Sequence, residues 1–129
     1  MIVVDASVAV DYLIKAAELP HLQEIINRQE SLAAPNLLKY ELGAVLRKHF
    51  LLGALTDIRA EQAFKDFELL RIDFYDMDPL VSRAWQLRQN ITYYDASYVT
   101  LAEFLNVPLL TRDKKLGAAP GHKAEIIVI

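Results

Sequence analysis

Two acidic residues come shortly after apolar segments, at points where a buried strand would end. Asp5 follows the β-branched run 2–4, and Asp113 lies two residues beyond the largely apolar run 107–111. A short apolar run without polar alternation is typical of a strand buried on both faces of a parallel sheet. In open sheets of this kind, ligands bind beyond the carboxyl ends of the strands. We therefore expect both carboxylates to lie at that edge of the sheet.

Two further acids lie on predicted helices, on the apolar face instead of the solvent face. Glu41 lies about 40° around the helix from both Leu37 and Val45, so it projects from the apolar stripe. Asp95 extends the stripe formed by residues 98, 102 and 105 backwards by three residues. An ionised carboxylate that faces a core is costly unless a partner compensates its charge. These two positions therefore call for a compensating partner.

A divalent metal ion is the partner that this set of side chains favours. The four carboxylates would repel one another unless a hard cation bound between them, and Mg²⁺ and Mn²⁺ prefer all-oxygen surroundings. A metal held in this way can orient a phosphodiester and generate hydroxide for in-line attack. Ser7 and Thr111 each lie two residues from a strand-end acid, and their hydroxyls could orient the carboxylates or a water ligand.

Each acid taken singly also has an ordinary structural explanation. Asp5 and Asp95 each precede a helical stripe and could be N-caps, although neither is followed by the Glu or Gln of a capping box. Glu41 could reach solvent or pair with Lys48, and Asp113 could be a loop acid. The functional interpretation depends on the four acids as a set.

Basic and aromatic residues beside two of these acids suggest contacts to a nucleic acid. Arg112, Lys114 and Lys115 surround the second strand-end acid, and cations fix a nucleic-acid backbone without reading its sequence. A solvated charged loop is the alternative. Tyr93 and Tyr94 precede the second helical acid, and they could stack on unpaired bases or pack against the protein.

The elements that must position these residues alternate along the chain. Strands are expected at 2–4, 31–34, 72–75, 107–111 and 125–129, and helices at 6–16, 22–26, 35–52, from 56, from 78 and at 95–105. In the third helix, Pro35 would occupy the first turn and Gly53 would follow the end. Asp78 and Pro79 would give the fifth helix its N-cap and first residue. This alternation predicts an α/β domain with a mostly parallel central sheet.

Length and composition exclude several other kinds of protein. The 129 residues fit a single domain, 1–129, and a hydrophobic share of 53% excludes a disordered chain. The absence of cysteine excludes disulfide frameworks and zinc–thiolate sites. The longest uncharged stretches, such as 49–56, are far shorter than the roughly 20 residues of a membrane helix, and the basic start of a signal peptide is missing. We therefore expect a cytoplasmic protein that does not enter a membrane.

The net charge of −3 first argues against a nucleic-acid-binding protein, which usually carries a basic excess. It comes from 14 basic and 17 acidic residues. Without the four acids of the predicted site, 14 basic residues face 13 acidic ones. A bound divalent cation would neutralise part of the remaining acidity. The charge therefore does not argue against a nucleic-acid substrate.

The four acidic motifs, taken in order, resemble those of the PIN-domain ribonucleases, and in particular the VapC-type toxins of toxin–antitoxin pairs. The matching segments span nearly the whole chain: IVVDAS at 2–7, YEL at 40–42, YDASY at 94–98 and LTRDKKL at 110–116. The resemblance implies a PIN-like three-layer α/β/α fold, a homodimer, Mg²⁺- or Mn²⁺-dependent endonucleolytic cleavage of RNA, and inhibition by a cognate VapB-like antitoxin. It implies metal binding and catalysis by Asp5, Glu41, Asp95 and Asp113.

Other functions remain as alternatives. A phosphoacceptor receiver domain would need adjacent acids after the first strand, and a haloacid-dehalogenase-type phosphatase would need a second Asp at the position of Ser7. A metal-free ribonuclease would need paired histidines, but His21, His49 and His122 share no local motif. A non-catalytic PIN-like module that binds RNA or protein would not need all four acids.

Overall fold

Five short parallel strands form the centre of the molecule, in a computed structural model that describes residues 1–129. The strands are β1 (Ile2–Val4), β2 (Leu32–Pro35), β3 (Ile72–Tyr75), β4 (Leu109–Thr111) and β5 (Ile126–Val128). Their order in the sheet is β3-β2-β1-β4-β5, and every neighbouring pair is parallel. All three residues of β1 are buried, because helices cover both faces of the sheet there. The expected mostly parallel sheet is confirmed.

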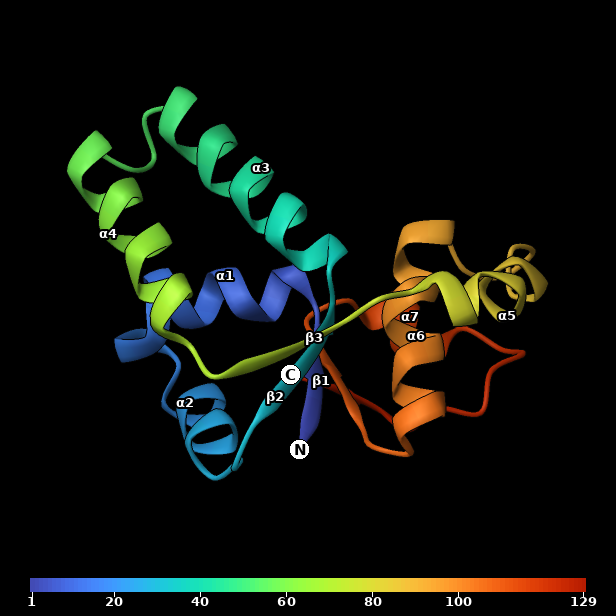
Figure 1. Cartoon of the computed structure of the whole chain (residues 1–129). Coiled ribbons are helices and arrows are strands. Elements are labelled where there is room, and N and C mark those ends of the chain that lie inside the picture. The colour runs from blue at the N-terminus through green and yellow to red at the C-terminus, as the bar shows by residue number, and fades with distance from the viewer.

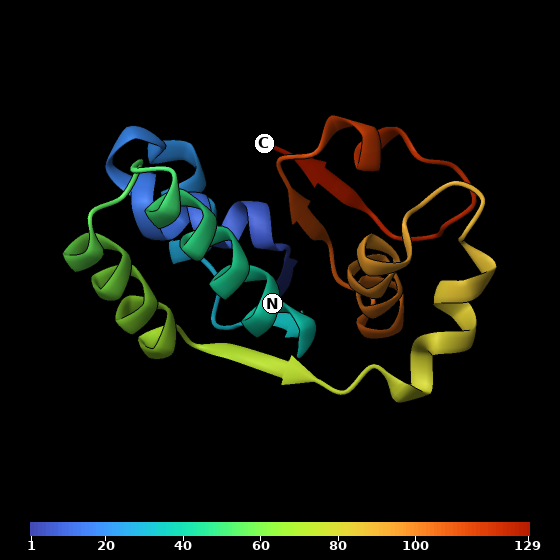
Figure 2. The ribbon, with the colours of Figure 1, turned by 90° about the horizontal axis from the view of Figure 1, so that it is seen from above.

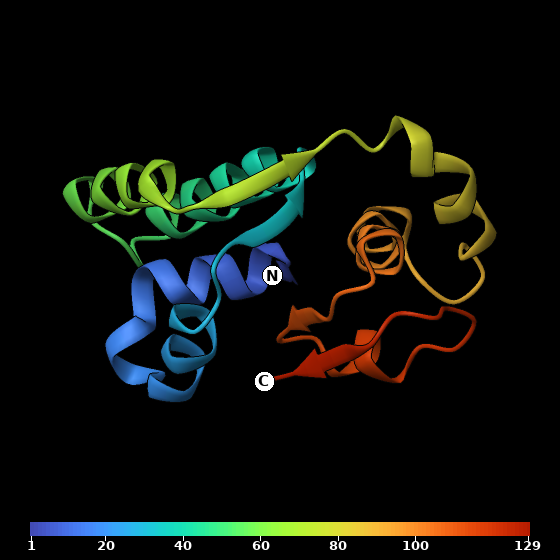
Figure 3. The ribbon, with the colours of Figure 1, turned by 60° about the horizontal axis from the view of Figure 1, so that its bottom comes forward.

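Helices lie on both sides of this sheet, which gives the expected three-layer α/β/α arrangement (Figures 1 and 2). One side carries α1 (Ala6–Lys15), α2 (Pro20–Asn27), α3 (Leu37–Leu51) and α4 (Asp57–Leu69), with the short 3₁₀ helix η1 (Ala16–Glu18) after α1. The other side carries α5 (Val81–Gln86) and α6 (Tyr93–Leu105). The short α7 (Lys114–Ala118) packs along β4 and β5. Figure 3 shows the two edge strands, β3 and β5, at opposite ends of the sheet.

The sheet has its topological switch point between β1 and β4. From β1 the chain proceeds to β2 and β3 on one side, whereas β4 and β5 lie on the other side of β1. Crossovers diverge at such a point and leave room for a ligand beyond the strand ends. Asp5 follows β1 and Asp113 follows β4, so both strand-end acids flank the switch point.

Side-chain caps fix where several helices begin. Asp5 accepts a hydrogen bond from the backbone N–H of Val8 at the start of α1, and Thr56 and Thr92 cap α4 and α6 in the same way. Asp113 caps α7 by accepting from two backbone N–H groups. Each cap satisfies N–H groups that have no partner within the helix. The caps therefore fix the helix starts, two of which carry strand-end acids.

Several element boundaries differ from the sequence-based expectation. Pro35 ends β2 instead of starting α3, because its segment pairs with β3 as far as Tyr75 and proline lacks an N–H to donate. Asp78 is not an N-cap: it lies inside the 3₁₀ helix η2 (Asp78–Leu80), and its N–H donates to the carboxylate of Asp76. The following α5 ends before Arg88.

Two differences concern the acids directly. Helix α6, expected at 95–105, begins at Tyr93, so Asp95 lies within its first turn, while Thr92 is the N-cap. Asp113 is not an acid in an irregular loop, because it caps the short helix α7. The charge-rich sequence of this segment gives no indication of that helix. No helix of the molecule is long and apolar enough to cross a membrane.

The contact between α7 and β5 gives a test of the fold. A Cβ atom added at Gly117 would overlap the side chain of Val128, so we expect Gly117→Ala to lower the free energy of unfolding by about 1 kcal/mol. The control is Gly43→Ala in α3, where an added Cβ meets nothing within 4 Å. This change should instead stabilise by about 0.5–1 kcal/mol. Urea unfolding measures both. The fold account is wrong here if Val128→Ala does not relieve the cost of Gly117→Ala.

Candidate active site

Asp5 is the most firmly held of the four acids. It lies at the end of β1 with 9% of its surface exposed. Its Oδ1 accepts from the Ser7 hydroxyl at 2.6 Å and from the Val8 N–H at 3.0 Å, and its Oδ2 accepts from the Thr111 hydroxyl at 2.5 Å. No basic side chain pairs with it. Donors on both oxygens fix the orientation of this carboxylate.

Thr111 and Ser7 link the ends of the two central strands. Thr111 is fully buried, and its Oγ1 donates to Asp5 and accepts from the backbone N–H of Asp113 at 3.0 Å. The Ser7 hydroxyl accepts from the backbone N–H of Arg112 at 3.2 Å. Both hydroxyl groups therefore donate to Asp5, as expected of groups that orient a carboxylate. Both also accept from backbone N–H groups of the β4–α7 connection.

Asp113 and Asp95 come from two other segments: Asp113 follows β4, and Asp95 lies at the start of α6. Asp113 uses Oδ1 to cap α7, accepting from the backbone N–H groups of Lys115 at 2.8 Å and Leu116 at 3.4 Å. Asp95 lies in the first turn of α6. Burial raises the pKa of Asp95, a hydrogen bond involving Thr92 lowers it, and the charges of Asp113 and Asp5 raise it further. Two strand-end acids therefore lie within electrostatic range of Asp95.

Glu41 enters the site from α3 and is held by a buried tyrosine. Its Oε1 accepts from the Tyr98 hydroxyl at 2.8 Å, and Tyr98 is only 1% exposed. Burial raises the pKa of Glu41, the Tyr98 bond lowers it, and the charges of Asp95 and Asp5 raise it. Burial and the neighbouring Glu41 raise the pKa of Tyr98, which keeps its hydroxyl protonated as a donor. Glu41 therefore pairs with Tyr98 and not with Lys48.

Tyr98 is the residue that the sequence interpretation missed. Its position in the apolar stripe of α6 had indicated only packing. A buried tyrosine hydroxyl normally finds a hydrogen-bond partner. Tyr98 lies one helical turn after Asp95 and hence on the same face, which was the available signal.

The four acids thus come from four separate elements and influence one another electrostatically, and none of them forms a salt bridge. In this arrangement of side chains, no three acidic or histidine groups are close enough together to hold a metal ion. The donor set nevertheless fits a hard divalent cation. It consists of oxygen ligands only, and it carries negative charge that no protein group neutralises.

The basic residues beside Asp113 divide into two kinds. Arg112 forms a salt bridge with Asp11 of α1, with Nε 3.0 Å from Oδ2, so its charge is already paired. Lys114 and Lys115 are exposed and form no salt bridge. Of the three cations expected at a phosphate, the two lysines are therefore the ones free to bind an anion.

The histidines do not form the pair that a metal-free ribonuclease would need. His21 lies in α2, His49 near the end of α3, and His122 in the segment before β5. Each belongs to a different part of the fold, and none lies at the start of α1, α6 or α7, where Asp5, Asp95 and Asp113 lie. Histidine-based catalysis finds no support in this arrangement.

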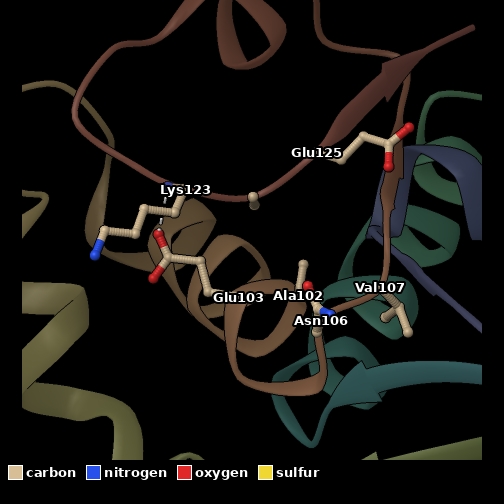
Figure 4. A pocket seen from close by; sticks show the side chains of 7 residues that line it. Ala102, Glu103, Asn106, Val107, Lys123 and Glu125 are labelled. Atoms are coloured by element: carbon tan, nitrogen blue, oxygen red, sulfur yellow. Dashed lines mark hydrogen bonds between the residues drawn. The ribbon is translucent and has the colours of Figure 1, made fainter.

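A cavity of about 320 Å³ lies at the far end of α6, away from the acids (Figure 4). One of its two glutamates, Glu103, accepts from the guanidinium of Arg83 at 2.9 and 3.1 Å and from the Lys123 N–H at 2.8 Å. Burial by itself would raise the pKa of Glu103, but these hydrogen bonds and the nearby Arg83 and His122 lower it. The cavity is lined by one partner of a structural ion pair, Glu103, and by none of the four acids.

Metal-free protein should become more stable when one of the crowded charges is removed. Glu41→Gln removes the charge but keeps an acceptor for Tyr98. We therefore expect its free energy of unfolding in EDTA to exceed that of the wild type at about pH 7. Glu68→Gln, at an exposed position on α4 without an ion pair, is the control and should change little.

The pH dependence has a definite sign. A raised pKa means that the folded state binds more protons than the unfolded chain between the ordinary pKa of Glu41, 4.5, and the raised value. The charge penalty is full above the raised value and absent below 4.5. The advantage of Glu41→Gln should therefore vanish on acidification to about pH 4. Urea unfolding at both pH values measures the difference in free energy of unfolding between Glu41→Gln and the wild type. An equal difference at both pH values would contradict this explanation.

Comparison with known proteins identifies the family. The PIN domain family model matches residues 2–121. The chain is 42% identical to Ribonuclease VapC1 of Mycobacterium tuberculosis over 130 aligned residues, which cover 98% of this chain and 96% of that protein.

Solved structures agree with this result. PAE2754 from Pyrobaculum aerophilum superposes with a TM-score of 0.74 at 28% identity, covering 97% of this chain and 81% of that one. VapBC2 from Rickettsia felis, bound to a DNA fragment from its promoter, superposes with a TM-score of 0.66 at 18% identity over 98% of each chain, which is a likeness of fold. The family match and the VapC1 relative both extend over most of the sequence, and on these grounds the chain belongs to the PIN domain family.

Proposed function

We propose that this protein is a metal-dependent endoribonuclease that hydrolyses RNA phosphodiester bonds and acts as the toxin of a VapBC-type toxin–antitoxin pair. The proposal is supported by four carboxylates from four elements that lack a basic partner, with Asp5 and Asp113 beside the switch point and Glu41 and Asp95 within electrostatic range of neighbouring acids. The name of the relative that is 42% identical, Ribonuclease VapC1, supports RNA as the substrate.

We assign the binding of Mg²⁺ or Mn²⁺ to these four side chains: Asp5, Glu41, Asp95 and Asp113. When bound, such a cation supplies Lewis acidity, which lowers the pKa of water and offsets charge that develops on the phosphate. Ser7 and Thr111 hold Asp5 in one orientation, which reduces the entropy lost on binding. Metal binding would also relieve the repulsion within the set.

Glu41 and Asp95 are the carboxylates best suited to accept a proton from the attacking water. In the metal-free protein, burial and the neighbouring acids raise the pKa values of these two carboxylates, so they take up a proton more readily than ordinary carboxylates. The Tyr98 hydroxyl occupies one oxygen of Glu41 and leaves the other free to accept. Asp5 is less suited to this role, because donors already occupy both of its oxygens.

Lys114 and Lys115 are the candidates for contacts to the RNA backbone. They follow Asp113 directly, are exposed and form no salt bridge. Arg112 would have to leave Asp11 before it could bind a phosphate, so in this structure its role is to join the β4–α7 connection to α1. Such contacts would position the strand without selecting its sequence.

We further propose a cognate antitoxin and a second copy of this chain as partners. The toxin–antitoxin structures from Rickettsia felis and Klebsiella pneumoniae share the fold, which supports the first. Large apolar side chains are exposed on two parts of the molecule, and such patches mark protein contacts. They lie on and between α3 and α4 (Leu51, Leu52, Ile58, Leu69) and on α5 (Val81, Trp85).

The catalytic assignment predicts loss of cleavage without loss of fold. Asp95→Asn should cut RNA at least about 100-fold more slowly than the wild type in Mg²⁺, because a ligand and a candidate base are removed. EDTA should abolish wild-type cleavage, and Mg²⁺ or Mn²⁺ should restore it. The control is Asp73→Asn, at an exposed position on β3. Defined RNAs resolved on a gel give the rates.

Wild-type rates in folded Asp95→Asn would contradict the assignment. Cleavage that persists in EDTA would contradict metal dependence. If the folded wild type cuts no RNA with either metal, the alternative of a non-catalytic PIN-like binding module replaces this proposal.

The role given to Thr111 predicts weaker metal use. Thr111→Val keeps the size of the side chain but removes the donor to Asp5, so about 10-fold more Mg²⁺ should be needed for half-maximal cleavage. Thr100→Val, on α6, is the matched control. Thr100 is equally buried, but its hydroxyl bonds only to backbone carbonyls of its own helix. An unchanged Mg²⁺ requirement in Thr111→Val, or an equal shift in Thr100→Val, would refute this role.

A further inference from the structure

A second cavity, of about 360 Å³, lies beside the four acids Asp5, Glu41, Asp95 and Asp113, which we call the acidic cluster. Its walls come from the start of α3, the connection that follows β3, and the start of α6. Figure 2 shows this connection leaving β3 and passing the start of α3 on its way to α5. Tyr40 and Tyr94 line the cavity and directly precede Glu41 and Asp95. The cavity therefore shares two helices with the candidate active site, and we call it the tyrosine pocket.

Three exposed tyrosines dominate the tyrosine pocket. Tyr40 is 78% exposed, Tyr93 48% and Tyr94 65%, and none of these three rings stacks on another aromatic residue. Exposed aromatic rings beside a site for nucleic acid serve as platforms on which unpaired bases stack. The volume lies in the range of small-ligand pockets, about 300–1,000 Å³. A flat ring system is therefore the shape that this surface fits.

The polar groups of the pocket select against a phosphate and for a hydrogen-bond donor. Asp76 and Asp78 line it, and no lysine or arginine does. The carboxylate of Asp78 forms no salt bridge, and the side chain of Asn36 forms no capping bond at the start of α3. Carboxylates accept from exocyclic amino groups of bases, such as the N4 amino group of cytosine. The backbone of an RNA strand would be repelled here, whereas a base edge with an amino group would be bound.

We propose that the tyrosine pocket binds an unpaired nucleobase that carries an exocyclic amino group, on the RNA strand whose phosphate lies at the acidic cluster. This inference rests on the proposed ribonuclease function. The base stacks on Tyr94, and its amino group donates to Asp78. The pocket lies near the carboxyl end of β3. Lys114 and Lys115 lie near the carboxyl end of β4, on the other side of β1. The strand would thus run across the cluster from lysines to tyrosines.

Free nucleosides test the pocket without a phosphate, a metal or catalysis. Cytidine and uridine have nearly the same size, but cytidine has an amino group where uridine has a carbonyl. In NMR titrations of metal-free protein, cytidine should shift the signals of Tyr93, Tyr94 and Met77 at concentrations at least threefold lower than uridine, and ribose should shift none. Asp78→Asn should bring the two nucleosides to equal affinity. Equal affinity in the wild type, or shifts only elsewhere, would overturn the proposal.

Cleavage kinetics then connect the pocket to the substrate. Tyr94→Ala should raise KM for a cytidine-containing oligonucleotide about tenfold with kcat little changed, and Tyr94→Phe should restore the wild-type KM. Phe104→Ala is the matched control, because Phe104 is also 65% exposed on α6 but lies outside the pocket. An unchanged KM in Tyr94→Ala would overturn the pocket as a substrate site while leaving the ribonuclease intact. Absence of all cleavage would count against the proposed function itself, whatever the nucleoside titration shows.

Discussion

The hydrogen bond from Thr111 to Asp5 joins the two strands on which the site depends. It is buried, spans 106 positions of the chain, and connects the end of β4 to the end of β1 at the switch point of the sheet. The same threonine oxygen accepts from the N–H of Asp113, so one side chain sets the positions of two acids. The Ser7 hydroxyl at the start of α1 makes the corresponding link, because it donates to Asp5 and accepts from the backbone N–H of Arg112. A parallel sheet brings strand ends together, and these hydroxyl groups fix them there.

Charge crowding is the cost of this arrangement. Burial raises the pKa values of Glu41 and Asp95, neighbouring carboxylates raise them further, and no salt bridge relieves them. Elsewhere the same fold pairs its charges well, as the bidentate contact of Arg83 with Glu103 shows. Natural proteins often depart from the usual rules of packing and charge pairing at functional sites, and the rest of the fold offsets the lost stability. The contrast between a neutralised ion pair at one end of α6 and uncompensated acids at the other supports the proposed site at the second end.

The sequence predicts the layers of this fold well and its connections less well. Buried runs such as 2–4 identify strands because both faces are covered, and helical stripes identify which side of α3 and α6 faces inward. Pro35 was misplaced because strand pairing, which is a long-range effect, overrode its preference for a helix start. The partners of Glu41 and Arg112 were missed for the same reason: Tyr98 and Asp11 are distant in sequence and become neighbours only through packing. Spacing along one chain places a side chain on a face, but it does not show what lies opposite.

The central claim is that the four carboxylates together form the binding site for divalent metal. Crystals soaked in Mn²⁺ and measured for anomalous scattering test it directly, because the signal reports the position of the metal independently of activity. The account predicts an anomalous peak beside the carboxylates of Asp5, Glu41, Asp95 and Asp113, where they would hold the metal directly or through water. A peak elsewhere on the molecule, or none at the sheet edge at saturating Mn²⁺, would contradict it.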